Sequence, residues 1–488
     1  MKKILLGLVA VFALNSCTDE DYDNLNHDQK NPEDVPASFL VTGATTSYFY
    51  RMISTNVNQN IFRLVSQYWN ETQYTQETNY DLEGRSISDN LWNEINMKVL
   101  YNLDDARKRV ELNEDLDKEE KANQLAIIDL LQVQAWQTLI DTFGNIPYSE
   151  ALQGKDNLNP KYDDAKTIYE DLIKRAIKST NAIDVNSPGF LKSDIIYYTT
   201  ENGIVTYNSD MSKWKKFGAS LQLKLGIQLS DVDASLAQST IANAVNVGVF
   251  SSQADNFTLR YTGSEPYTNP LWIDLIKSGR TDFVAANTIV DKMNTLNDPR
   301  RAKFFKENLG EGVFVGGEYG RATAFAGHTQ ISATLESMSY PGTLLDYTEV
   351  QFMLAEAAAR GFAVGGTAES FYESAIRASF EFWGNTTVEA NTYLAQPNVA
   401  YATAAGDWKQ KIGTQFWLAM YNKGFEGWNV WRRLDAPIFN LPQATKNPVP
   451  TRYTYPIRER NLNATNHNQA SSAIGGDTQT TKLFWDVN

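Results

Sequence analysis

Cysteine and histidine are nearly absent from this 488-residue sequence, which contains one cysteine, Cys17, and three histidines. A single thiol excludes an internal disulfide framework and a cysteine-based metal site. No His-Glu-x-x-His, Gly-x-Ser-x-Gly or Gly-x-x-x-x-Gly-Lys-Ser/Thr pattern occurs, so a zinc protease, a nucleophile-elbow hydrolase and a phosphate-binding loop lack support. A glycoside hydrolase needs only two suitably spaced carboxylates and therefore stays open as an alternative.

Glycine and proline are scarce as well, with 29 and 15 residues, which argues against a collagen-like, linker-dominated or disordered chain. Hydrophobic residues make up 42% of the sequence, enough for a substantial core. Acidic residues exceed basic residues: the chain has 58 Asp and Glu and 44 Lys and Arg, for a net charge of −14. Proteins that follow a phosphate backbone carry basic stripes, so we expect no nucleic-acid partner.

The longest apolar run near the amino terminus, residues 4–14, is about half of the ~20 residues that a membrane-spanning helix needs. It follows two lysines and precedes small residues, as in an export signal. Leu14-Asn15-Ser16-Cys17 resembles a bacterial lipobox, which predicts a lipoprotein signal peptide over residues 1–16 and lipidation of Cys17. An ordinary signal peptide followed by a chance cysteine is the alternative.

An acidic run follows Cys17, reading Thr-Asp-Glu-Asp-Tyr-Asp over residues 18–23. It resembles the surface-export signal of Bacteroidetes lipoproteins, and the alternative is a solvated tether, since clustered like charges favour disorder. We expect residues 17–31 to form a lipidated acidic tether and the protein to be anchored in the outer membrane and exposed at the cell surface. Stable anchoring needs more than one acyl chain, which lipidation at such a cysteine supplies.

Helical periodicity dominates the remainder, so the sequence predicts a mainly α protein. Segments with apolar residues on one face are residues 91–110, 128–143, 163–177, 210–225, 350–361, 371–380 and 408–420. Only residues 313–315 and 452–455 resemble strands. We expect one domain over residues 32–488, with an irregular region at about 230–347 and an irregular tail at about 437–488. Paired amphipathic helices favour degenerate tetratricopeptide-like repeats.

Aromatic residues with polar neighbours, outside clean helical periodicity, are the candidates for a ligand site. A flat ring stacks on the apolar face of a sugar, and adjacent amides and charged groups bond its hydroxyls. The candidates are Trp69, Asn70, Tyr74, Tyr80, Tyr267, Trp272, Tyr319 and Arg321. The alternative for each is an anchoring role within a loop. By contrast, Trp136, Trp214, Trp417, Trp428 and Trp431 have helical spacing, which predicts core packing.

Several sequence blocks, in order, resemble the SusD/RagB family of nutrient-binding outer-membrane lipoproteins. They include Asn-Pro-Glu-Asp-Val-Pro at residues 31–36, Asp-Thr-Phe-Gly-Asn-Ile-Pro-Tyr-Ser-Glu-Ala-Leu at 141–152, Trp-Lys-Lys-Phe at 214–217, Leu-Ala-Glu-Ala at 354–357 and Trp-Arg-Arg-Leu at 431–434. The resemblance implies four tetratricopeptide-like helix pairs that support an irregular, ligand-binding region. It also implies a SusC-like TonB-dependent transporter as partner and no catalysis. Some relatives hold calcium, but no EF-hand pattern occurs here, so we expect no cofactor.

The function expected from these observations is non-catalytic binding of oligosaccharides or polysaccharides and their delivery to the transporter. Capture of oligopeptides on the same scaffold is an alternative. A lipid-anchored glycoside hydrolase and a purely structural scaffold are alternatives from other classes.

Overall fold

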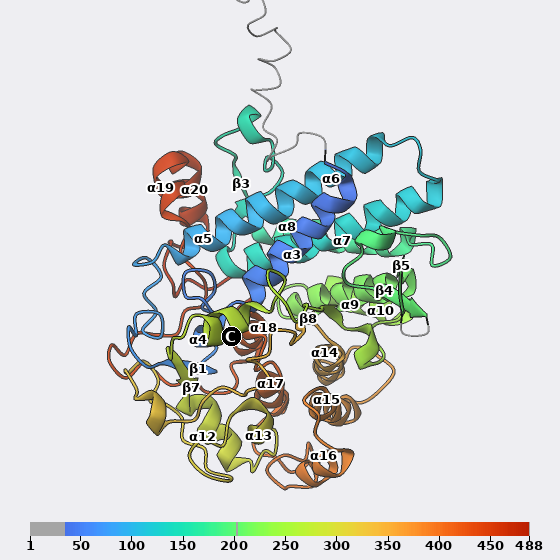
Figure 1. Cartoon of the computed structure of the whole chain (residues 1–488). Coiled ribbons are helices and arrows are strands. Elements are labelled where there is room, and N and C mark those ends of the chain that lie inside the picture. The colour runs from blue at the N-terminus through green and yellow to red at the C-terminus, as the bar shows by residue number, and fades with distance from the viewer. Residues whose placement is uncertain (1–34, 202–203, 488) are drawn as a thin grey trace, which may run out of the picture.

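Helices account for most of the computed structural model, which describes residues 35–201 and 204–487 (Figure 1). The α-helices of these residues are α3 (Ala37–Ile53), α4 (Phe62–Val65), α5 (Ile87–Asn93), α6 (Tyr101–Leu112), α7 (Lys118–Phe143), α8 (Ala165–Ala182), α9 (Met211–Gln228), α10 (Ala234–Val247), α11 (Pro270–Trp272), α12 (Asn287–Thr295), α13 (Arg301–Phe304), α14 (Tyr347–Ala359), α15 (Ala368–Phe382), α16 (Thr387–Leu394), α17 (Trp408–Ala419), α18 (Gly424–Leu434), α19 (Ile457–Leu462) and α20 (Ala464–Ala473). Two π-helical segments, η1 (Glu94–Leu100) and η5 (Ile273–Lys277), continue α5 and α11. The mainly α prediction is confirmed.

The strands of the described residues form two-stranded antiparallel ribbons. The pairs are β1 (Trp69–Glu71) with β7 (Phe283–Ala285), β2 (Ile146–Pro147) with β3 (Tyr162–Asp163), β4 (Tyr198–Glu201) with β5 (Ile204–Ser209), and β6 (Phe257–Leu259) with β8 (Gly342–Leu345). In the first ribbon Trp69 lies opposite Ala285 and Asn70 opposite Val284. Neither predicted strand forms, because residues 313–315 and 452–455 make side-chain and loop contacts instead of a ladder.

Helix starts follow the capping residues that the sequence offers. Asp164 accepts a hydrogen bond from the Thr167 amide at the start of α8, and Asp210 caps α9 in the same way. The region predicted to be irregular, residues 230–347, contains more helix than expected. Asp233 caps α10, whose Ala237, Ile241 and Ala244 are buried; α12 also lies within this region. The expectation overlooked this spacing of small apolar residues.

Successive helices pack side by side, α6 on α7, α7 on α8, α8 on α9 and α9 on α10, and α14 packs on α15 (Figure 1). These helices run along one side of the molecule, while α4, the β1–β7 ribbon, α12 and α13 occupy the other. The division into four tetratricopeptide-like units stays a prediction. Tryptophans 136, 214, 417 and 428 are buried as expected, and Trp431 is half-buried.

A buried ionic cluster joins α9, α14 and α18. The Lys224 ammonium contacts the carboxylates of Glu349 and Glu426, and Lys423 contacts Glu349 and Asp346. Buried charges are tolerated where each has an opposite partner, and removing one leaves the others uncompensated. The cluster therefore fixes the relative positions of three helices that are distant in sequence.

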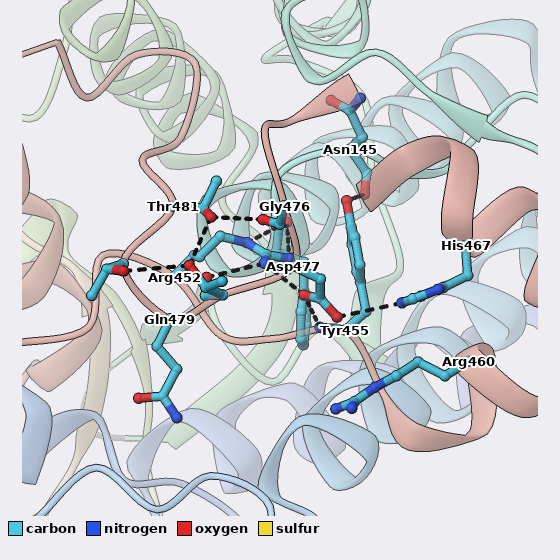
Figure 2. Close-up of polar contacts among 12 residues, drawn as sticks. Asn145, Arg452, Tyr455, Arg460, His467, Gly476, Asp477, Gln479 and Thr481 are labelled. Atoms are coloured by element: carbon cyan, nitrogen blue, oxygen red, sulfur yellow. Dashed lines mark hydrogen bonds and ion pairs between the residues drawn. The ribbon is translucent and has the colours of Figure 1, made fainter. Parts of the chain in front are cut away.

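The tail beyond residue 437 contains α19 and α20 between irregular segments, and Arg452 holds it against the helices (Figure 2). Arg452 is buried and donates from Nη2 to the Phe143 carbonyl (2.9 Å) and from Nη1 to Asp477 Oδ1 (2.7 Å). Asp477 also accepts from the Tyr455 amide at 2.9 Å, and the Tyr455 hydroxyl donates to the Asn145 carbonyl. The tail is thus fastened at the end of α7.

Among the helices of the described residues, none combines the length and apolar character needed to cross a membrane. The predicted signal peptide, Cys17 and the acidic tether lie outside the described residues.

Candidate functional site

The predicted site residues separate into a buried group and an exposed group. Trp69 is fully enclosed: its indole nitrogen donates to the Tyr421 hydroxyl (3.0 Å), and the Arg63 guanidinium lies 5.3 Å from its ring centre. Phe283 packs against the same ring. The expectation of an open Trp69 platform is therefore wrong, because strand pairing turns the ring inward and leaves no face for a ligand.

Asn70, Tyr80 and Tyr319 are buried too, and each holds a loop in place. The Asn70 amide donates to the Arg321 carbonyl (2.9 Å) and accepts from the Gly320 amide (3.0 Å), which ties residues 320–321 to β1. The Tyr80 hydroxyl accepts from Gln67, and the Tyr319 hydroxyl donates to the Leu64 carbonyl at 2.6 Å. These residues take the loop-anchoring role that the sequence left open for them.

Tyr74, Tyr267 and Arg321 are exposed, and Trp272 is half-buried. Tyr74 is 60% exposed on the loop after β1. The Lys277 ammonium lies 6.0 Å from the Trp272 ring centre and also pairs with Glu265, two residues before Tyr267. Arg321 pairs with Glu318 (3.2 Å). The exposed members thus lie on the loops around the β1–β7 ribbon and η5.

A cavity of about 270 Å³ opens beside this ribbon. Its walls come from the turn after α3, the end of η5 and the start of β7, and the lining residues used below are Asn56, Arg85, Asp274, Ser278, Arg280 and Asp282. We call this cavity and the neighbouring Tyr74 the ribbon site. Sequence reasoning missed all six residues, although Ser278-Gly279-Arg280-Thr281-Asp282 is a polar run that closely follows Trp272.

Asp274 builds the inner wall of the ribbon site. Its Oδ2 accepts hydrogen bonds from the Ser54 hydroxyl (2.8 Å) and from the amides of Thr55 (2.9 Å) and Asn56 (3.0 Å). Burial raises the pKa of Asp274, and these hydrogen bonds partly oppose that rise. Through its Oδ2 atom the carboxylate therefore anchors the turn after α3 to η5.

Arg280 and Asp282 offer polar atoms toward solvent. Arg280 donates to Asp282 Oδ2, and this hydrogen bond raises the pKa of Arg280, with a smaller contribution from the nearby Tyr74. The other oxygen, Asp282 Oδ1, is buried and has no partner among the described residues. A buried acceptor without a partner is costly to the folded state.

A pair of carboxyl groups lies behind the ribbon site. Glu71 Oε2 accepts from the amide (2.9 Å) and hydroxyl (2.8 Å) of Thr78. Burial, followed by a hydrogen bond with Glu77, raises the pKa of Glu71 well above its usual range. Glu77 is also buried and pairs with Arg85, which lines the cavity. Arg85 therefore has a fixed anionic partner and presents its charge at the cavity wall.

The arrangement suits a neutral polyhydroxylated ligand. An exposed ring supplies a flat apolar face, and the cavity residues Arg280, Arg85 and Asp282 supply hydrogen-bonding groups near it. Within residues 35–201 and 204–487, no group of three or more His, Cys, Asp or Glu side chains is placed to hold a metal ion.

A family model described as starch-binding and associating with the outer membrane matches residues 29–456. The chain therefore belongs to the SusD-like family. This match confirms the family resemblance that the sequence blocks indicated. No curated protein sequence matches the chain significantly.

Solved structures of the same fold cover nearly the whole chain. A chitin-binding protein is 25% identical with a TM-score of 0.78, over 93% of this chain and 100% of its own. A SusD homologue from Bacteroides uniformis is 24% identical (TM-score 0.78, 92% and 100% covered). A chitin-binding SusD homologue from Flavobacterium johnsoniae is 24% identical (TM-score 0.77, 92% and 99% covered).

Proposed function

We propose that this protein binds oligosaccharides or polysaccharides at the ribbon site without cleaving them. The observation that carries the proposal is an exposed ring, Tyr74, near a cavity whose wall holds the polar side chains of Arg280 and Asp282. Membership of a family described as starch-binding supports this ligand class. The name of a structurally similar chitin-binding protein supports it as well.

Delivery of the bound glycan to a SusC-like TonB-dependent transporter is the second part of the proposal. It rests on the family's described association with the outer membrane and on the predicted lipid anchor at Cys17. The protein would then hold its ligand above a membrane channel, tethered through residues 17–31. Co-purification of the transporter with the lipidated protein, lost when the anchor is removed, would support this step.

Calorimetric titration of the full chain with maltohexaose and chitohexaose tests the binding step. We expect Tyr74→Ala and Arg280→Ala each to raise Kd by about tenfold or more, since aromatic and arginine contacts dominate binding surfaces. Phe39→Ala, which removes an equally exposed ring on α3, is the matched control and leaves Kd unchanged. Unaltered affinity in both ribbon-site variants contradicts this location.

Incubation of the same protein with either sugar separates binding from hydrolysis. We expect no release of reducing ends over hours, because Asp274 Oδ2 is held by three hydrogen bonds, Asp282 is paired with Arg280, and Glu71 and Glu77 are buried. Turnover abolished by one carboxylate substitution would favour the hydrolase. Tight binding of oligopeptides in place of both sugars would favour peptide capture on the same scaffold.

A further inference from the structure

A second, larger cavity lies among α6, α7 and α8 and shares no lining residue with the ribbon site. Its volume is about 780 Å³, and residues 148–156, between β2 and β3, form part of its wall. Figure 1 shows these helices at the end of the molecule away from the β1–β7 ribbon. We call it the helical cavity. The volume lies in the range of small-molecule sites, so its chemistry decides what it could hold.

Two donors on one face of α7 lie in its wall with no acceptor among the described residues. Gln132 is only 4% exposed; its Oε1 accepts from Arg175 Nη2 at 2.7 Å, whereas its Nε2 has no partner in that part of the chain. Trp136, one turn further along, is 3% exposed, and its indole nitrogen likewise has no partner in the part of the chain described. Both nitrogens can donate to a ligand that enters the cavity.

Trp136 differs in its indole hydrogen bonding from the five fully buried tryptophans, and resembles Trp92 and Trp383, which are also buried and also have no acceptor among the described residues. The fully buried tryptophans each donate their indole hydrogen to a defined acceptor: Trp69 to Tyr421, Trp214 to Asp194, Trp417 to Ser66, Trp428 to Pro450 and Trp485 to Asp141. A buried indole N–H normally finds such a partner, because leaving it unpaired forfeits the hydrogen bond that it makes in water. Trp136 lines the cavity, so a ligand hydroxyl in the cavity could accept its indole hydrogen.

Arg175 is held rigidly at the same wall. Its Nε donates to Asp129 Oδ1 (2.9 Å), and its Nη1 donates to the Tyr148 hydroxyl (2.8 Å), which in turn donates to Asp171. Asp129, Gln132 and Trp136 all face the cavity from α7. The wall therefore presents planar polar groups in a fixed geometry, and a ligand would lose little free energy in ordering them.

The charges of the lining cancel. Its acidic members are Asp104, Asp129 and Asp156, and its basic members are Arg107, Lys108 and Arg175. This balance contrasts with the net charge of −14 of the whole chain. It selects neither a strong anion nor a strong cation and favours a neutral ligand with many hydroxyl groups.

An exposed ring stands at the edge of the cavity. Tyr101 is 48% exposed at the junction of η1 and α6, and it also lines an adjacent apolar hollow of about 390 Å³ that contains Met97 and Pro147. π-helical segments are rare and are often found at functional sites. The ring lies between a polar and an apolar hollow, as a ring that stacks on a sugar would.

We propose that the helical cavity is a second binding site for a neutral saccharide unit, with Tyr101 as the stacking ring and Gln132 and Trp136 as donors to its hydroxyls. The proposal does not depend on the ribbon site, since no residue is shared. A chain with two such sites could hold a polymeric glycan at two points, and avidity would then exceed the affinity of either site.

Calorimetric titration of the full chain with a panel of neutral hexasaccharides, from starch, chitin, cellulose and mannan, tests the proposal. We expect one of them to bind with two sites per chain. Tyr101→Ala and Trp136→Phe should both weaken binding at the helical cavity by about tenfold, and Tyr74→Ala should weaken binding at the ribbon site. Circular dichroism shows whether Trp136→Phe still folds. If it does not, Tyr101→Ala still tests the proposal, because Tyr101 is exposed and its replacement should not disturb folding. Phe39→Ala is again the control.

The outcomes for the two sites are distinguishable. If Tyr74→Ala loses all binding and Tyr101→Ala binds as the unaltered protein does, the second site is overturned and the proposed function stays intact. The reverse result overturns the ribbon site and keeps the helical cavity. Absence of a Tyr101-dependent site with every sugar, or a Tyr101-dependent site that accepts diglycine but no sugar, overturns the proposal.

Discussion

Trp69 and Tyr74 lie five residues apart, but the first is buried and the second is exposed, so substituting each tests how burial of a single residue affects stability. Trp69→Ala should lower the free energy of unfolding by roughly 3–5 kcal/mol, because it empties a fully enclosed site against Phe283 and Tyr421. Tyr74→Ala, the matched variant on the exposed loop, should change it by less than about 0.5 kcal/mol. Urea unfolding measures both. Equal, small effects would contradict the burial of Trp69.

Glu71 should make stability depend on pH. Burial and Glu77 raise the pKa of Glu71 from 4.5 to about 9, so the folded protein keeps a proton that the unfolded chain releases near pH 4.5. Its contribution is fully present below pH 4.5 and is lost as pH rises toward 9, with a slope of at most ~1.4 kcal/mol per pH unit. Glu71→Gln keeps the shape and removes this titration.

Relative to the unaltered protein, Glu71→Gln should therefore gain stability steadily between pH 5 and pH 9, as measured by urea unfolding at several pH values. Glu318→Gln, a half-exposed carboxylate that pairs with Arg321 nearby, is the control and should show no such trend. A constant difference between Glu71→Gln and the unaltered protein across this range would show that the Glu71 carboxyl is ionised in the folded state.

At the scale of elements, the carboxy-terminal tail depends on one arginine. Arg452→Ala should cost about 3–5 kcal/mol, because it leaves the Phe143 carbonyl and Asp477 without their buried partner. Arg460, also labelled in Figure 2, is a more exposed arginine that pairs with Glu83, and Arg460→Ala should cost less than about 1 kcal/mol. Thermal unfolding compares the two variants.

Limited proteolysis gives a second measurement of the same element. Detachment of residues 457–487 in Arg452→Ala should expose α19 and α20 to cleavage well before the helices α6 to α9 are cut. Resistance of the tail equal to that of the unaltered protein would mean that the Tyr455 and His467 contacts hold the tail without Arg452.

The whole molecule is expected to work at a membrane surface, and the prediction at this scale concerns the anchor. Cys17→Ala should move the protein from the outer-membrane fraction to the soluble fraction, because Cys17 is the sole thiol and follows the predicted export signal. Replacing Asp19, Glu20, Asp21 and Asp23 by Ala should keep the lipid but reduce cleavage by protease added to intact cells. Full retention of Cys17→Ala on the membrane would remove the anchor from the proposal.

How much the sequence determines differs between helices and loops. Helices can be predicted from local sequence, because capping residues such as Asp164 and Asp210 and apolar residues at helical spacing specify them without distant contacts. Examples are α7, α8, α9, α14 and α17. The family resemblance is likewise carried by residues along the chain. Both predictions were confirmed.

The division between buried and exposed aromatic residues was decided by tertiary structure alone. Trp69, Asn70 and Tyr74 share a polar stretch of sequence, yet pairing of β1 with β7, some 200 residues later in the chain, encloses the first two and leaves the third outside. The cavities arise in the same way, since Arg280 meets Asn56 and Gln132 meets Arg175 only after distant segments pack. Local sequence patterns do not predict such contacts, because the burial of a residue depends on the distant segments that folding brings next to it.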